Sequence, residues 1–232
     1  GFTLYPAEIP LPPEDKFADV IDIQGQTENP GGIEGAVDRM AVEIDRSLQD
    51  RKTLVIWLFD ESGSMAPRRN AIADRFQSVY KQLGGFKSSD QDIQRGLLKT
   101  AVVGFSDKTN FYTPQPVDDV NEIVTKIRNI KAAQSPDENV FTAVSQVTRK
   151  WLNYRRRMRY DVMVVIVTDE RGSDYGQDGA ALEKVIQLTR TNGIRVYCIG
   201  NAAVFGREKG WVLYTYPDGY SQEWDVDQGP ET

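Results

Sequence analysis

Acidic and hydroxyl side chains follow a short apolar run in the stretch LVIWLFDESGSM, residues 54–65. Asp60, Ser62 and Ser64 alternate along this segment, so that one turning loop could direct three oxygen atoms at one point. Gly63 would permit the tight backbone that such a turn needs. Carboxylate and hydroxyl oxygens are hard donors that suit Mg²⁺, Mn²⁺ or Ca²⁺. The spacing therefore indicates a site for a divalent cation.

A second apolar run, DVMVVIVTDE at residues 161–170, also ends in acids, Asp169 and Glu170. Short apolar runs bounded by polar residues predict strands that are buried on both faces of a sheet. In open parallel α/β sheets, ligands bind beyond the carboxyl ends of the strands. We therefore expect Asp60 and Asp169 to lie together at one sheet edge. In a competing interpretation both acids cap the helices that follow them, and the serines form a hydrogen-bonded turn.

Helices and strands are predicted to alternate through most of the chain. Apolar residues recur at helical spacing in residues 33–48, 72–83, 120–130, 140–152 and 182–189, and strands are predicted at 54–59, 100–107, 161–170 and 194–200. This alternation predicts an α/β fold, doubly wound, with a mostly parallel sheet and helices on both faces.

Three segments are expected along the chain. Residues 1–50 form an N-terminal arm, with at most one short strand around Val20–Ile23, and an amphipathic helix. Residues 51–201 form the core. Residues 202–232 break the alternation and are predicted to form a C-terminal β-hairpin packed on the core, with its turn at Pro217-Asp218-Gly219.

The amino-acid composition argues against several kinds of site. The 232 residues include no histidine, which removes Ser-His-Asp catalysis, histidine-ligated zinc and the commonest general base. The one cysteine, Cys198, can form no internal disulfide and is expected to fill a strand. A net charge of −6 argues against non-specific binding of nucleic acid. No run reaches the ~18 apolar residues of a membrane span, and the Gly1-Phe2 start suggests a processed or excerpted fragment.

These segments resemble the von Willebrand factor type A domain family. DESGSM matches the family's Asp-x-Ser-x-Ser motif between a buried strand and a helix. VVIVTDE resembles the family's second acidic strand end, and VVGFSD is similar to its second strand. The order of predicted strands and helices agrees from about Thr53 to Gly200, roughly two thirds of the chain. We expect a bacterial member of the family.

The resemblance implies a metal-ion-dependent adhesion site that binds Mg²⁺, or Mn²⁺ or Ca²⁺. In that case Ser62 and Ser64 ligate the cation directly, and Asp60 and Asp169 hold it directly or through waters. An open coordination position is filled in such domains by a carboxylate from a partner protein. The implied function is metal-dependent protein binding, in adhesion or scaffolding.

The third loop of this site departs from the family pattern. Setting ENVFTAV against the family's TN-x-x-x-A-L pattern places Glu138 where the family has a threonine, while the alternative alignment makes Thr142 the ligand. We favour Glu138. A partner carboxylate ~4 Å from Glu138 would meet a repulsion of up to ~4 kcal/mol at a dielectric constant near 20. Glu138 therefore either fills the open position itself or restricts the site to non-acidic partners. Glu61 and Glu170 are interpreted as charges on the rim.

Two further interpretations stay open. In a structural alternative, the metal only stabilises the loops while partner proteins bind elsewhere. An enzyme is not expected, because no base is evident beyond the carboxylates and no Gly-rich phosphate loop is present.

The arginine-rich run RKWLNYRRRMRYD, residues 149–161, could bind nucleic acid or acidic lipid. Its position favours a solvated helix terminus, where cations suit the helix dipole. Localisation is open, with the cell envelope favoured over the cytoplasm.

Overall fold

The computed structural model describes residues 32–85, 97–170, 172–176, 179–200, 210–215 and 221–226. The predicted arm, its short strand at Val20–Ile23 and the predicted turn at Pro217-Asp218-Gly219 lie outside these residues. Within the described ranges, no helix is long and apolar enough to cross a membrane.

Five of the described strands form one sheet in the order β3-β2-β1-β4-β5. Their bounds are β1 Thr53–Asp60, β2 Leu98–Phe105, β3 Thr109–Phe111, β4 Asp161–Val167 and β5 Arg195–Ile199. β1 lies between β2 and β4 and pairs in parallel with both, β5 pairs in parallel with β4, and β3 runs antiparallel to β2. The four parallel strands begin at one edge, here named the amino edge, and end at the opposite carboxyl edge.

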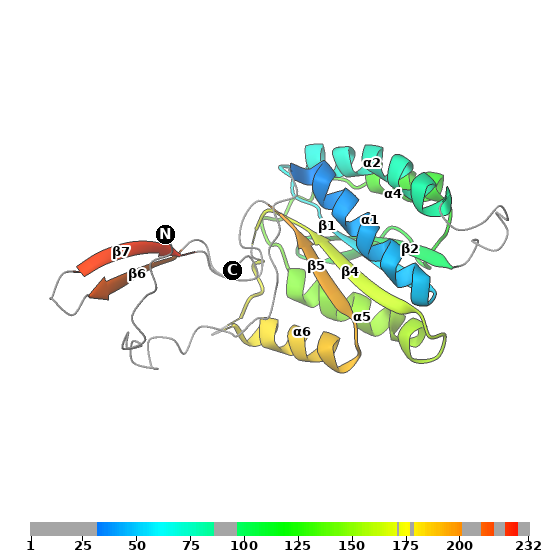
Figure 1. Cartoon of the computed structure of the whole chain (residues 1–232). Helices are drawn as coiled ribbons and strands as arrows, with labels where there is room; N and C mark the ends of the chain where they lie inside the picture. Colours follow the sequence, from blue (N-terminus) through cyan, green and yellow to red (C-terminus); the bar gives the residue numbers. More distant parts are fainter. Residues whose placement is uncertain are drawn as a thin grey trace, which may run out of the picture.

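Helices cover both faces of this sheet (Figure 1). One face carries α1 (Gly32–Asp50), α2 (Ala66–Gly85) and α4 (Val120–Arg128), and the other carries α5 (Val140–Arg156) and α6 (Ala180–Thr191). The predicted doubly wound α/β fold is confirmed.

The side chains of β1 explain why the sheet needs both helical layers. All eight residues of β1 are buried. Because successive side chains of a strand point to opposite faces, Val55, Trp57 and Phe59 pack with the layer of α1, α2 and α4. Leu54, Ile56 and Leu58 pack with α5 and α6. The strand therefore lies in the centre of the fold, and its carboxyl end is held firmly.

Helix α1 is part of this core. Its predicted apolar stripe is confirmed, since Val37, Met40 and Ile44 are buried against the sheet and the neighbouring helix α2. Residues spaced three and four apart lie on one face of a helix, which is why this stripe can cover the sheet.

Two features lie outside the main alternation. β3 was not predicted, because three residues are too short to show a period. β6 (Gly210–Thr215) and β7 (Ser221–Val226) pair in antiparallel fashion, which confirms the predicted hairpin. Among the described strands these two pair only with each other, and packing of the hairpin on the core stays a prediction.

Candidate metal centre at the carboxyl edge

Asp60 is the last residue of β1 and is fully buried. Its Oδ1 accepts a hydrogen bond from the backbone N–H of Ser62 at 2.6 Å, and its Oδ2 accepts one from Thr168 Oγ1 at 2.8 Å. The pairing of Phe59 with Val167 in the sheet brings Asp60 beside Thr168. Helix α2 begins only at Ala66, so Asp60 does not cap it. The carboxylate instead joins the loop after β1 to the end of β4.

The two serines of the motif lie in a tight turn after Asp60. Their hydroxyl oxygens are 3.0 Å apart, and the N–H of Met65 reaches the carbonyl of Ser62 at 3.3 Å. Gly63 was expected to permit this turn, but the turn makes no use of the conformational freedom of glycine. The φ of Gly63 is not in the left-handed region, and a Cβ there would meet no other atom within 4 Å. The serine oxygens are thus brought together by the backbone path and not by a glycine.

Arg69 of α2 holds this loop in place, although its role was not predicted. Its side chain is buried, and Nη1 donates to the backbone carbonyls of Asp60 at 2.6 Å and Ser62 at 3.0 Å. Burial lowers the pKa of Arg69, whereas the nearby charges of Asp60 and Glu61 raise it. A guanidinium has several donors in a fixed plane, which lets one side chain bind two carbonyls of a turning segment.

Glu61 is not the rim charge that the sequence suggested. The residue is only 3% exposed, and its carboxylate accepts hydrogen bonds from Tyr112 Oη and Asn110 Nδ2, both at 2.8 Å. Burial and the bond to Glu61 raise the pKa of Tyr112 to about 12. Gly104 of β2 makes the space, because a Cβ there would lie 2.0 Å from Glu61 Oε1. Glu61 therefore anchors the loop to β2 and β3.

Glu138, in the loop before α5, lies beside Asp60. The residue is buried, and its backbone N–H donates to Ser173 Oγ at 2.9 Å. Burial raises the pKa of Glu138 to about 8, together with the charge of Asp60 and a hydrogen bond to it, and the charges of Glu170 and Asp169. Oε2 of Glu138 is buried and has no hydrogen-bond partner in the described part of the chain.

Thr142, the alternative ligand, is an exposed residue of α5. Its backbone N–H donates to Asp174 Oδ2 at 2.7 Å, and the N–H of Phe141 donates to Oδ1 of the same carboxylate at 3.1 Å. Asp174 thereby satisfies the free N–H groups at the start of α5.

Asp169 lies two residues beyond β4 and forms an ion pair with Arg68 of α2, Nη1 to Oδ2 at 2.6 Å. Its Oδ1 is buried and makes no hydrogen bond within the described residues. Asp169 caps no helix, because α6 begins eleven residues later, at Ala180. Glu170 is exposed, as expected of a rim charge.

The structure thus gathers carboxyl groups at one edge, with Glu138 bonded to Asp60 and with Asp169 and Glu170 close enough to raise its pKa. Thr168, Arg68 and Arg69 were missed by sequence reasoning. The described residues contain no group of three or more His, Cys, Asp or Glu side chains placed to hold a metal ion. A cation here would therefore need the serine hydroxyls as well as the acids.

Fold and motif together define the class of protein. The chain belongs to the von Willebrand factor type A domain family, whose model matches residues 55–209. The predicted resemblance is confirmed. Domains of this family are typically protein-interaction modules.

No curated protein matches the chain. It is similar to the solved structure of proximal thread matrix protein 1 from the mussel byssus, with 17% identity, a TM-score of 0.45, and coverage of 65% of this chain and 36% of that one. It is similar to a von Willebrand factor type A protein from Catenulispora acidiphila, with 16% identity, a TM-score of 0.46, and coverage of 65% and 33%.

A third similar structure holds three N-terminal domains of the type V pili tip protein Mfa5 from Porphyromonas gingivalis, with 13% identity, a TM-score of 0.40, and coverage of 53% of this chain and 20% of that one. The chain spans 36% or less of the length of each of these three chains.

Proposed function

We propose that this chain is a protein-binding domain, for adhesion or scaffolding, that uses a divalent cation at the carboxyl edge of its sheet. The ligands in this proposal are Asp60, Ser62, Ser64 and Asp169, with Glu138 at the third loop. The observation that carries the proposal is a pair of buried carboxylate oxygens without hydrogen-bond partners among the described residues, Oε2 of Glu138 and Oδ1 of Asp169. Buried polar atoms are normally paired, so two such oxygens at one edge support a cation as their partner.

The chemistry of the donors fits such an ion. All proposed ligands are carboxylate or hydroxyl oxygens, the preferred donors of Mg²⁺, Mn²⁺ and Ca²⁺. Asp60 and Glu138 also repel each other when both are ionised, which contributes to the raised pKa of Glu138. A bound cation would supply the positive charge that relieves this repulsion. It would also offer an open coordination position to a carboxylate of a partner protein.

The surrounding residues would orient the ligands. Arg69 and Glu61 fix the backbone of the loop from opposite sides through their buried hydrogen bonds. Arg68 binds Oδ2 of Asp169, so it neutralises part of the acidic edge and competes with a cation for that carboxylate.

Titration of the full chain with Mn²⁺, followed by electron paramagnetic resonance of free Mn²⁺, tests the proposal. We expect saturable binding that weakens at least about tenfold in Asp60→Asn and in the double variant Ser62→Ala, Ser64→Ala. Glu122→Gln, which removes one exposed charge from α4, is the control and should bind as the native chain does. Absence of saturable binding, or unchanged binding in Asp60→Asn, would contradict the proposal.

A second candidate is a structural role, in which Glu138 fills the open coordination position and partners bind elsewhere. The buried contact between Glu138 and Asp60 favours it. Water-proton relaxation by protein-bound Mn²⁺ separates the two, because it measures exchangeable water on the ion. If Glu138 fills the open coordination position of the ion, Glu138→Thr should raise the water-proton relaxation and allow a carboxylate probe such as acetate to bind the ion. If Glu138 does not fill it, the native chain and the variant should show the same relaxation and the same acetate binding.

A further inference from the structure

The amino edge of the sheet carries cations that the proposed metal site does not use. They come from three places that are distant in sequence, namely the end of α1, the end of α5 with the turn that follows it, and the start of β5. They are Arg46, Arg51, Lys52, Arg155, Arg156, Arg157, Arg159 and Arg195. Pairing of β1 with β4 brings the first two of these places together. Thr53 is opposite Asp161, and the N–H of Asp161 donates to the carbonyl of Lys52 at 2.7 Å.

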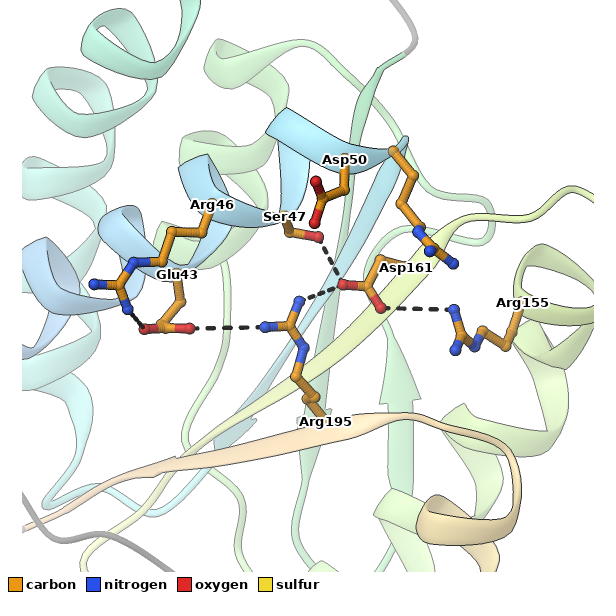
Figure 2. A pocket seen from close by; sticks show the side chains of 8 residues that line it. Glu43, Arg46, Ser47, Asp50, Arg155, Asp161 and Arg195 are labelled. Atoms are coloured by element: carbon orange, nitrogen blue, oxygen red, sulfur yellow. Dashed lines mark hydrogen bonds and ion pairs between the residues drawn. The ribbon is translucent and has the colours of Figure 1, made fainter.

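An inner layer of this edge is balanced in charge. A pocket of about 320 Å³ at this edge is lined by four arginines, three acids and one serine (Figure 2). Without the exposed Arg51, its arginines and acids are equal in number. Asp161 accepts hydrogen bonds from Ser47 Oγ at 2.7 Å and from Arg195, and lies 3.7 Å from Arg155 Nη1. Glu43 pairs with Arg46 at 2.9 Å and with Arg195 at 3.7 Å. Asp161 and Glu43 are thus already neutralised by their neighbours.

An outer layer is not balanced. Arg51, which lines the pocket, and Arg157 and Arg159 in the turn after α5 are exposed. Their side chains form no hydrogen bond or ion pair with any described residue. Each guanidinium offers five N–H donors in a planar fork that matches the two oxygens of a carboxylate. In a chain of net charge −6, unpaired cations gathered at one edge can attract an anionic partner.

The turn itself gives an independent indication. Arg159 has φ of 59°, in the left-handed region where glycine is favoured and other residues are strained. Met158, next to it, is 53% exposed. The turn therefore exposes Arg159 and the apolar Met158 to solvent, although glycine at position 159 would adopt this backbone conformation without strain.

We propose that the amino edge is a docking surface for an acidic segment of a partner protein. Carboxylates of the partner pair with Arg51, Arg157 and Arg159, and an apolar side chain of the partner packs on Met158. This surface lies at the opposite end of the sheet from the proposed metal site and does not depend on it.

Two observations favour protein carboxylates over nucleic acid or an anionic membrane. Trp151 and Tyr160 of the arginine-rich run are buried, and its third aromatic residue, the half-buried Tyr154, packs edge-on against Tyr160. The run therefore offers bases no exposed aromatic side chain. Acids also line the pocket between the arginines, Asp50 among them. A continuous row of phosphates would meet these acids, whereas separate carboxylates can pair with individual arginines.

The test measures fluorescence anisotropy of a labelled peptide, with glutamates and one leucine in a Gly-Ser background, added to the full chain. EDTA is present throughout, so that the metal site plays no part. Failure of the proposed metal-dependent function can then be distinguished from failure of this docking surface. The comparison probes are the same peptide with glutamine for glutamate, a DNA duplex and vesicles containing phosphatidylserine.

We expect the glutamate peptide to bind, with an affinity that falls in ~0.3 M salt, and the glutamine peptide not to bind. Arg51→Glu and Arg157→Glu should each weaken binding about fivefold or more. Lys184→Glu makes the same charge change at an exposed site of α6 and should have little effect. Arg159→Gly should weaken binding while raising the melting temperature, so loss of folding cannot explain the loss of binding.

Several results would overturn the proposal. They are no binding of the glutamate peptide at low salt, equal binding by Arg157→Glu and the native chain, or equal losses in Arg157→Glu and Lys184→Glu. Tighter binding of the duplex or the vesicles than of the peptide would also overturn it, and would assign the surface to that class of partner.

Discussion

The two edges of the sheet hold acids in contrasting surroundings. At the amino edge, Asp161 is bound by Ser47, Arg155 and Arg195. At the carboxyl edge, Glu138 lies against another acid, Asp60. The amino-edge carboxylate finds its counter-charges within the fold, while the carboxyl-edge pair lacks enough of them. Titratable groups whose charges the fold leaves uncompensated are candidates for function. By this criterion the acids of the carboxyl edge are candidates, and Asp161 at the amino edge is not.

Two glutamates of low exposure make the contrast concrete. Burial raises the pKa of Glu43, but hydrogen bonding to Arg39 and the charges of Arg39, Arg46 and Arg195 outweigh burial, and the net shift is downward. For Glu138, burial and Asp60 act in the same direction and raise the pKa to about 8. The neighbours, and not burial alone, decide the sign of the shift.

The largest effect is expected at the amino edge from Asp161→Asn. The variant keeps the shape of the side chain but leaves Arg155 and Arg195 facing a neutral group. We expect a loss of about 2–4 kcal/mol in the free energy of unfolding, measured in urea. Glu34→Gln, an exposed change in the first turn of α1, should alter stability by less than about 0.5 kcal/mol. Equal effects of the two variants would remove the contrast between the edges.

At the carboxyl edge, Arg69→Met should cost about 2 kcal/mol, because the carbonyls of Asp60 and Ser62 lose a buried donor. Mn²⁺ affinity should fall with it, since the loop is no longer fixed. The adjacent variant Arg68→Met is the informative partner. It frees Asp169 from its ion pair and should raise Mn²⁺ affinity. If Mn²⁺ affinity changed in the same direction in Arg69→Met and Arg68→Met, the two arginines would not have the separate roles assigned to them.

A somewhat smaller effect concerns pH, measured in EDTA. The pKa of Glu138 is raised from 4.5 to about 8, so the folded chain keeps a proton that the unfolded chain releases. The associated stabilisation is complete below pH 4.5 and is lost as the pH rises through about 8. Glu138→Gln should remove this fall, with a relative gain of about 1–2 kcal/mol at high pH. Parallel stability curves for variant and native chain would contradict the conflict inferred at this edge.

The smallest effect is a gain at the amino edge. Arg159→Gly should raise the free energy of unfolding by about 1 kcal/mol, because glycine adopts a positive φ without strain. Thermal unfolding measures the change, and Arg157→Gly, a residue with negative φ at the end of α5, should instead be destabilising. A loss of stability in Arg159→Gly would mean that the side chain makes a contact that outweighs the strain.

Periodicity predicted the layers of this fold well. Apolar spacing located all five helices and four of the five sheet strands that the structure describes in the core, because burial of a helix face or a strand imposes its period on the sequence. β3 has only three residues and depends on pairing with β2, so no local pattern marked it.

The carboxyl edge was predictable only in part. Asp60 and Asp169 were found because acids directly after buried strands are an unusual local pattern. The burial of Glu61 depends on Gly104, more than forty residues away, and could not be read from its neighbours. Arg68 and Arg69 are ordinary helix residues by sequence, and Asp161 accepts a hydrogen bond from Ser47, which is 114 residues away.

The buried stripe of α1 bears on where the foldable unit starts. The family match begins at residue 55, whereas Val37, Met40 and Ile44 lie upstream and are each less than 5% exposed. Leaving three such side chains out of the core would forfeit roughly 5–9 kcal/mol of apolar burial, as much as many domains have in total. A fragment trimmed to the family boundary would keep α2 and α4 but expose to water the apolar surface that α1 covers, and it should aggregate.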